Sequence, residues 1–346
     1  MLYATTRNKN DTYTAQRALR ENRAPDGGLY IPVQIPSYDH DQILELKNLP
    51  AGEIIARVMN QFFACRINRW DVEFAIGKNI FNLVSMSHRI TVGELWRNAD
   101  GEFSRITRIL TERIAVEKED CVPGQWMRVA TRIAVLFALF AELMRKDLAA
   151  PEEPVDIAVP TGDFCWPLAA WYGRAMGLPI GTIVCCCNEN GTAWDLLRRG
   201  QMRTDGPVIK SNTPGYDFAL PDGLEALICL TLGWEESARY QAACEKGGIY
   251  EISEEQHELQ SPGMYASVSS SKRLLADISN AYRTHGYVFC PYSALVYAGL
   301  MDYRATAGEG NGALIVCERS PLHSQELVAR TMGTTVEQLR KWLSVV

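Results

Sequence analysis

The sequence predicts an α/β fold with a doubly wound, mostly parallel sheet. Short apolar runs typical of buried strands alternate with longer stretches whose apolar residues recur at helical spacing, and this alternation favours parallel strands joined by crossover helices. The stretch 156–176 shows the pattern best: an apolar strand ends in Pro160, Gly162 opens a turn, and helical spacing follows. Such a turn presents backbone N–H groups where a helix begins, which favours an anion. A plain strand-to-helix turn would show the same residues, so both interpretations stay open.

The other elements follow from local signals in chain order. Residues 2–5 predict a strand, and Pro-Asp-Gly-Gly at 25–28 predicts a turn that leads into an extended segment. Amphipathic spacing predicts helices at 50–65 and 71–76, so residues 1–82 form a helical N-terminal subdomain. The remaining residues, 83–346, form the large α/β domain, with helices expected at 102–114, 125–146, 193–199, 224–231, 235–245 and 272–285, and extended segments at 83–96, 157–159, 182–187, 248–252 and 313–317.

Composition restricts the class of protein. A net charge of −6 argues against a nucleic-acid surface, because such surfaces collect Lys and Arg against phosphates. The longest apolar run, 133–141, is far shorter than the ~20 residues of a membrane span. No apolar leader is visible near Met1, and ten cysteines without one indicate reduced thiols. We therefore expect a cytoplasmic protein that binds neither nucleic acid nor membrane.

Two short motifs have simple structural explanations. Cys185, Cys186 and Cys187 lie in an expected strand, where successive side chains point to opposite faces, so the three thiols cannot meet at one metal ion. Ser269 and Lys272 have the spacing of a serine acyl-enzyme, but the companion motifs are absent and the serines stand where a helix cap is expected. No metal site is predicted.

Five segments, in one order along the chain, resemble the threonine synthase family, which has the tryptophan-synthase β-like fold (fold type II) of pyridoxal-phosphate (PLP) enzymes. They are Thr5-Thr6-Arg7 with Ala-Pro-Asp-Gly-Gly-Leu-Tyr-Ile-Pro at 24–32, Val-Pro-Thr-Gly-Asp-Phe at 159–164, Asn-Glu-Asn at 188–190, Thr-Pro-Gly-Tyr-Asp-Phe at 213–218, and 291–294. The resemblance covers almost the whole chain and implies the family's fold.

The resemblance also exposes a change at the family's essential lysine. The segment 94–105 aligns with the family's Glu-Leu-Phe-His-Gly-Pro-Thr-Leu-Ala-Phe-Lys-Asp motif and places Ser104 at the lysine position. A serine cannot form an imine with the cofactor aldehyde, so the covalent anchor would be missing. No lysine stands between Lys78 and Lys118, and among the remaining lysines Lys210 is the least unsuitable substitute.

A second departure is a gap. The family has a mobile small subdomain between the lysine helix and the helix that resembles 130–143 here, and this chain offers only 115–129 in that interval. That length is too short for one βαβ unit of ~30 residues. The small PLP subdomain is therefore expected to be deleted between 115 and 129.

The third departure lies in the cofactor contacts. The family's phosphate-binding turn corresponds to Gly162, Asp163, Phe164 and Cys165, and an aspartate there repels a phosphate. Glu318 aligns where the family faces the pyridine nitrogen and would still pair with a protonated one. These residues are the expected remnant site, and the expectation is no cofactor, or pyridoxal phosphate if the family site is retained.

The combined prediction is a threonine synthase-like protein that has lost PLP-dependent catalysis and binds a partner or a small anionic or amino-acid-like ligand. One alternative is a retained PLP-dependent lyase with relocated residues drawn from Asp163, Cys165, Glu318 and His323. Another is a regulatory subunit that assembles as a homo-oligomer or with an intact homologue. Assembly at the deletion predicts exposed aromatic side chains, with Trp126, Phe137 and Phe140 as candidates.

Overall fold

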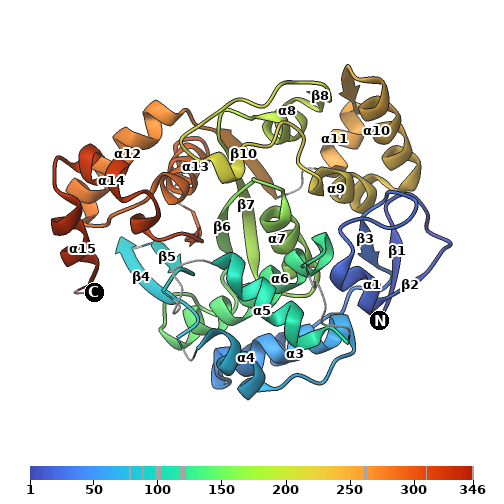
Figure 1. The fold of residues 1–346 in the computed structure, drawn as a ribbon, viewed down its shortest axis with the longest axis horizontal. Coiled ribbons are helices and arrows are strands. Elements are labelled where there is room, and N and C mark those ends of the chain that lie inside the picture. Colours follow the sequence, from blue (N-terminus) through green and yellow to red (C-terminus); the bar gives the residue numbers. More distant parts are fainter. Residues whose placement is uncertain are drawn as a thin grey trace.

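A six-stranded sheet forms the centre of the computed structural model (Figure 1), which describes residues 1–77, 79–87, 89–97, 103–116, 122–260, 263–308 and 310–344. Its strand order is β10-β7-β6-β11-β5-β4. Only the β4–β5 pair is antiparallel among these strands, so the predicted mostly parallel sheet is confirmed. The strands are β4 (Asn82–Ser87), β5 (Ile90–Glu94), β6 (Val155–Pro160), β7 (Ile180–Cys187), β10 (Met264–Val268) and β11 (Gly312–Cys317).

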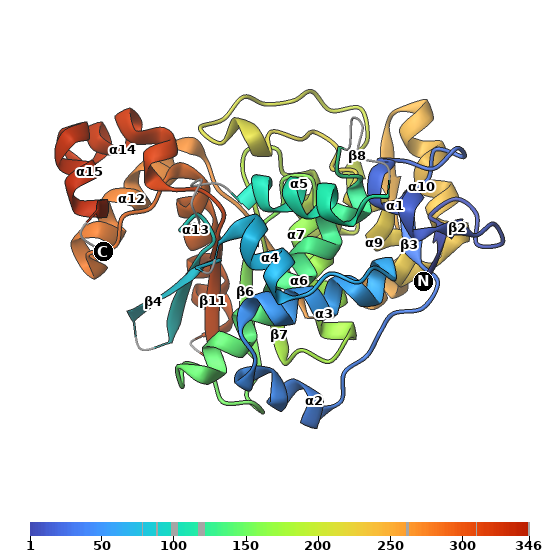
Figure 2. The ribbon, with the colours of Figure 1, turned by 60° about the horizontal axis from the view of Figure 1, so that its bottom comes forward.

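Helices cover both faces of this sheet, as the doubly wound prediction requires (Figure 2). Helices α6 (Gln125–Arg145) and α7 (Cys165–Ala175) lie on one face, and α13 (Pro291–Ala307) lies on the other with α12 (Ser271–His285) beside it. Residues along β7 alternate between the two cores: Cys185 and Cys187 belong to the first and Cys186 to the second. The three thiols therefore diverge, as expected from strand geometry.

The N-terminal region combines helices with a small antiparallel sheet. The sequence predicts two of its extended segments but not their pairing. Strand β1 (Leu2–Thr5) pairs antiparallel with β2 (Tyr13–Thr14) and with β3 (Tyr30–Pro32). The helices of this region are α1 (Ala15–Arg20), α2 (His40–Glu45), α3 (Ala51–Phe63) and α4 (Arg69–Ile76). One hydrophobic cluster runs from Tyr3 in β1 through α3 and α6 to the central sheet.

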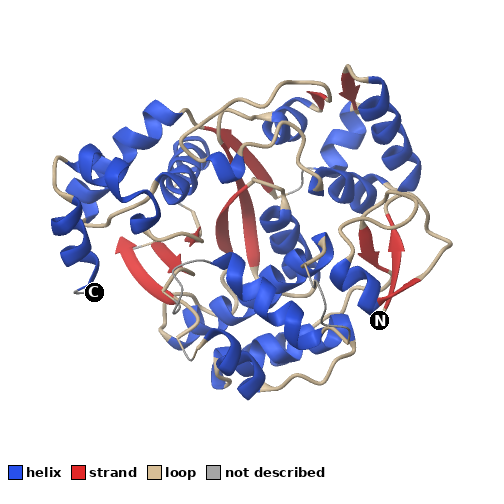
Figure 3. Ribbon diagram, in the orientation of Figure 1, coloured by secondary structure: helices blue, strands red, loops and turns tan. Residues whose placement is uncertain are grey.

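Further helices surround the central layers (Figure 3). They are α5 (Phe103–Ile114), α8 (Thr192–Arg199), α9 (Gly223–Leu232), α10 (Trp234–Lys246), α11 (Glu254–Gln260), α14 (Gln325–Met332) and α15 (Val336–Ser344), and a two-stranded ribbon joins β8 (Gln201–Arg203) to β9 (Ile249–Glu251). Ser270 caps α12 by accepting the Arg273 N–H at 3.3 Å, which confirms a serine cap at the start of this helix.

Trp126, Phe137 and Phe140, whose exposure would favour assembly at the deletion, are all buried, and this burial counts against the assembly hypothesis. Helix α6 runs between α3 and α7, and the Trp126 indole packs edge-on against Tyr172 and donates to the Tyr3 hydroxyl at 2.9 Å. These aromatics form the core and not an assembly face. Part of the deletion interval, residues 117–121, lies outside the described residues.

Within the ranges described, no helix combines the length and apolar character needed to cross a bilayer. The same residues contain no cluster of three His, Cys, Asp or Glu side chains arranged to hold a metal ion.

Candidate functional site

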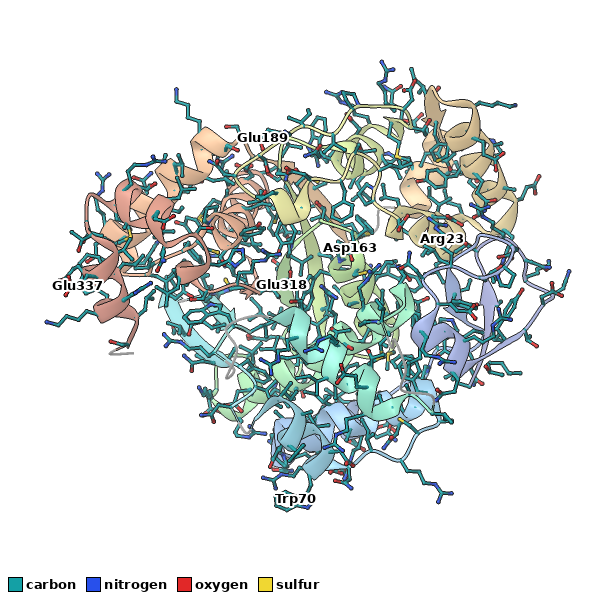
Figure 4. All side chains as sticks on the ribbon, viewed as in Figure 1. Arg23, Trp70, Asp163, Glu189, Glu318 and Glu337 are labelled. Atoms are coloured by element: carbon teal, nitrogen blue, oxygen red, sulfur yellow. The ribbon has the colours of Figure 1, made fainter. Side chains whose placement is uncertain are left out.

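The carboxyl ends of β6 and β11 meet at one edge of the sheet, where residues from distant parts of the chain enclose a cavity of about 120 Å³, the Glu318 pocket. Because parallel strands end at the same edge, the turn after β6 lies beside the residue that follows β11. Asp163 and Glu318 accordingly both lie near the middle of the molecule in Figure 4. The lining also includes Ser104 from α5, Arg132 from α6, and Tyr216 from the loop before α9.

A buried ion pair occupies the floor of this pocket. The Arg132 Nη2 atom lies 3.0 Å from Glu318 Oε1, and the Tyr216 hydroxyl donates to Glu318 Oε2 at 2.7 Å. Only 11% of the Arg132 side chain and 10% of the Glu318 side chain are exposed. Both oxygens of Glu318 are therefore already engaged.

Two aromatic rings hold the arginine in place. The guanidinium carbon of Arg132 lies 5.2 Å from the ring centroids of both Phe103 and Trp166. Burial on its own would lower the pKa of Arg132, but the charges of Glu318 and Asp163 raise that pKa. Burial and the Glu318 charge likewise raise the pKa of the Tyr216 phenol well above its usual range. Arg132 thus stays charged and Tyr216 stays protonated.

The turn after β6 contains a carboxylate, that of Asp163. Gly162 adopts φ +44° and Phe164 adopts φ +68°, and this tight path places the Asp163 carboxylate at the start of α7. Asp163 Oδ1 accepts the Cys165 N–H at 3.1 Å, and Oδ2 accepts the Cys165 thiol at 3.1 Å. The Arg128 Nε atom lies 3.5 Å from Oδ2. A side-chain carboxylate therefore stands where the resemblance implies a phosphate.

The sequence-predicted site residues divide into two groups. Ser104, Gly162, Asp163 and Glu318 line the pocket. Phe164 and Cys165, which belong to the same expected turn, have fully buried side chains that lie outside the lining, and burial raises the pKa of the Cys165 thiol. The remaining candidate, His323, lies beside the pocket, where its Nε2 atom is 2.7 Å from Arg319 Nη1.

Arg132, Tyr216 and Trp166 are the site residues that sequence reasoning missed. The available signal was Arg132 itself, a charge inside the apolar helix α6, since a charge that faces a core requires a partner. The Trp166 indole Nε1 is buried, lines the pocket, and has no acceptor among the described residues. The Arg132 Nε atom, in the same lining, is also buried without an acceptor among the described residues, so the pocket holds two donors that a ligand could satisfy.

These residues do not match the requirements of pyridoxal phosphate. The described lining contains no lysine, the acidic side chain expected at the pyridine nitrogen is bound to Arg132 and Tyr216, and Asp163 places a carboxylate where the resemblance implies a phosphate. A Cβ atom on Gly162 would lie 2.9 Å from the Tyr216 ring, so the phenol packs closely against this turn.

The chain is similar to known threonine synthases in sequence and fold. The family model "Threonine synthase N terminus" matches residues 2–79. Human "Threonine synthase-like 1" is 24% identical over 173 residues, which are 49% of this chain and 23% of that protein. The Pseudomonas aeruginosa threonine synthase is 24% identical over 237 residues, which are 66% of this chain and 46% of that protein. The chain thus spans about a quarter to a half of the length of these relatives.

Solved structures give the same fold. The PLP-bound threonine synthase of Brucella melitensis superposes with a TM-score of 0.80 at 19% identity, covering 96% of this chain and 92% of that one. Yeast threonine synthase gives 0.83 at 15% identity, covering 96% and 90%. The chain thus matches the threonine synthase family model over residues 2–79, is similar in sequence to threonine synthases over half to two thirds of its length, and shares their fold.

Proposed function

We propose that this chain is a threonine synthase-like protein that does not perform PLP-dependent catalysis and that uses the Glu318 pocket to hold a small ligand. The observation that carries the proposal is the Arg132–Glu318–Tyr216 cluster, in which the chain's own side chains satisfy the acidic group that the cofactor ring would need. Separating this pair to admit a ring would leave charges buried without partners, at a cost of about 3–5 kcal/mol.

The size and charge of the pocket support a small ligand with polar groups. Its volume of about 120 Å³ lies below the ~300–1,000 Å³ of pockets that hold drug-sized molecules. Arg132 and Arg319 face Asp163 and Glu318 across the lining, and the Trp166 N–H offers a donor. A small anion or an amino-acid-like zwitterion fits this mixture of charges.

Cofactor loading gives the first test. Purified protein is mixed with pyridoxal phosphate, its absorbance is recorded before and after borohydride reduction, and labelled peptides are mapped. We expect no saturable absorbance band and only scattered labelling of exposed lysines such as Lys210. A saturable band that reduction fixes onto one lysine would overturn the proposal and identify a relocated catalytic residue, as in a retained lyase.

The ligand is tested separately, by the indole N–H resonance of Trp166 during titration with glycine, acetate and inorganic phosphate. The Trp166→Phe variant assigns that resonance. A saturable shift with glycine or an anion supports the small-ligand role, because the buried N–H then gains an acceptor. A resonance that none of these probes moves would contradict the small-ligand role while leaving the absence of PLP chemistry as a separate result.

A further inference from the structure

A second and larger hollow lies on the face of the sheet that carries α12 and α13, and it shares no lining residue with the Glu318 pocket. It has a volume of about 460 Å³ and is bounded by the edge strand β4, the end of α12 and helix α15; we call it the Trp342 groove. This volume falls within the ~300–1,000 Å³ range of small-molecule sites.

The walls of the groove are apolar and aromatic. Val84 and Met86 enter from β4, and Tyr287, Trp342 and Leu343 enter from the opposite side. The Tyr282 and Trp342 rings are stacked, with centroids 5.3 Å apart and an angle of 19° between planes. Rigid aromatic walls of this kind favour a flat hydrophobic ligand, because ring stacking adds to the burial of apolar area.

The charged side chains around the groove differ in whether they have a partner of opposite charge. Glu94 is 2% exposed and is satisfied within the protein: Arg97 Nε lies 2.9 Å from Oε2, and the Tyr287 hydroxyl donates to Oε1 at 2.7 Å. Arg97 also donates to the Leu343 carbonyl at 3.3 Å, which ties α15 to the sheet. With this pair neutral, Lys341 is the charged lining side chain without a counterion among the described residues, and His285 lies on the same rim.

We propose that the Trp342 groove binds a small aromatic carboxylate, with the ring between the apolar walls and the carboxylate at Lys341. The unbalanced cation supplies the charge complementarity, and the described lining presents no unpaired carboxylate to oppose it. This inference is independent of the Glu318 pocket and of the function proposed for it.

The alternative ligand for this face is an extended peptide that adds a strand to β4, but the shape of β4 disfavours such pairing. The register of β4 against β5 shifts between Ser85 and Ser87, which marks a bulge in this edge strand. Bulges protect sheet edges from pairing with an added strand. A small molecule therefore suits the groove better than an extended peptide does.

The test uses calorimetric titration of the full chain with 4-phenylbutyrate and with its neutral analogue 4-phenylbutanol. We expect the acid to bind more tightly than the alcohol. The Lys341→Met variant should weaken the acid about fivefold and leave the alcohol unchanged, as for loss of one exposed ion pair of ~1 kcal/mol. The Val84→Phe variant should abolish binding of both by filling the groove, and Lys246→Met, which removes an exposed lysine of α10, is the matched control.

Three results would overturn the inference. These are no binding of the acid up to its solubility limit, an equal effect of Lys341→Met on acid and alcohol, and undiminished binding to a folded Val84→Phe protein. Folding of each variant is checked by circular dichroism, and Lys341→Met, on the exposed surface, keeps the charge test independent of core packing.

Discussion

The Glu318 pocket and the Trp342 groove differ in volume and in the chemistry of their walls. The pocket is small, and its floor consists of charged groups that pair with each other. The groove is about four times larger by volume, its walls are mainly hydrocarbon, and its one buried carboxylate is satisfied behind those walls. The Glu318 pocket thus leaves room only for a small polar ligand beside its own paired charges, whereas the Trp342 groove leaves a wider apolar space.

This difference predicts that substitutions at the two places have different effects on stability and on ligand binding. A buried ion pair needs both partners, since removal of one leaves an uncompensated charge. A single substitution in the Arg132–Glu318 pair should therefore destabilise the fold strongly. A substitution of the exposed Lys341 at the rim of the groove should change stability little. The predictions below test this contrast in stability first and in binding last.

The largest effect is expected for Glu318→Ala. This change leaves the Arg132 guanidinium buried between two rings without its carboxylate, and it should lower the free energy of unfolding by about 3–5 kcal/mol. Urea denaturation measures this value. Glu112→Ala is the matched control, since it breaks the exposed pair with Arg108 and should cost less than ~0.5 kcal/mol.

A Glu318→Ala loss below about 1 kcal/mol would show that the pocket's ion pair does not stabilise the fold. A double variant, Arg132→Leu with Glu318→Leu, should recover part of the loss, because paired apolar replacements remove both desolvation costs. No recovery would contradict the ion-pair explanation and point to packing around Phe103 and Trp166.

The second prediction concerns pH and the buried thiol of Cys165. Burial raises the pKa of this thiol in the folded chain above the ~8.5 of an unfolded cysteine. Its contribution to stability is therefore complete below pH ~8.5 and is lost as pH rises, by about 1.4 kcal/mol per pH unit while only the unfolded chain ionises. Cys165→Ala and Cys165→Ser should both flatten the alkaline fall in unfolding free energy by this amount. An unchanged slope in both variants would contradict the burial assignment.

The fold was largely predictable because its signals are local. The β6 strand, the turn at Gly162 and helix α7 follow from apolar spacing, and the cap at Ser270 follows from residue type. Strand β10 was not predicted: its Met-Tyr-Ala-Ser-Val sequence shows no clear alternation, and pairing with β7 determines it instead. Tertiary contacts decide such segments.

The site was predictable only where the family resemblance supplied positions. Ser104, Asp163 and Glu318 do line one pocket, but the Arg132–Glu318 pair joins residues 186 positions apart, and no local pattern indicates such a contact. Phe164 and Cys165 follow the same motif yet point into the core, because the positive φ at Phe164 turns the chain inward after Asp163. Side-chain direction at a tight turn depends on backbone angles that residue type alone does not give.

The third prediction separates Asp163 from the ion pair beside it. Asp163→Ala removes the acceptor of the Cys165 N–H at the start of α7 and the partner of Arg128, and it should cost about 1 kcal/mol, the usual net value of one lost hydrogen bond. Asp39→Ala, which removes the capping carboxylate of α2, is the control for an aspartate before a helix outside the pocket and should cost a similar amount. A loss for Asp163→Ala much above its control would mean that this carboxylate also stabilises the Arg132 charge.

The smallest stability effect is expected in the groove. Lys341→Met should change the free energy of unfolding by less than ~0.5 kcal/mol, because the side chain is exposed and has no ion pair among the described residues. The same substitution is the one expected to lower affinity for an aromatic carboxylate. Lys341 should therefore affect binding and not stability. Glu318 should affect mainly stability. If Lys341→Met destabilised the chain as strongly as Asp163→Ala does, the lysine would be a structural contact of α15, and the contrast between the two places would no longer hold.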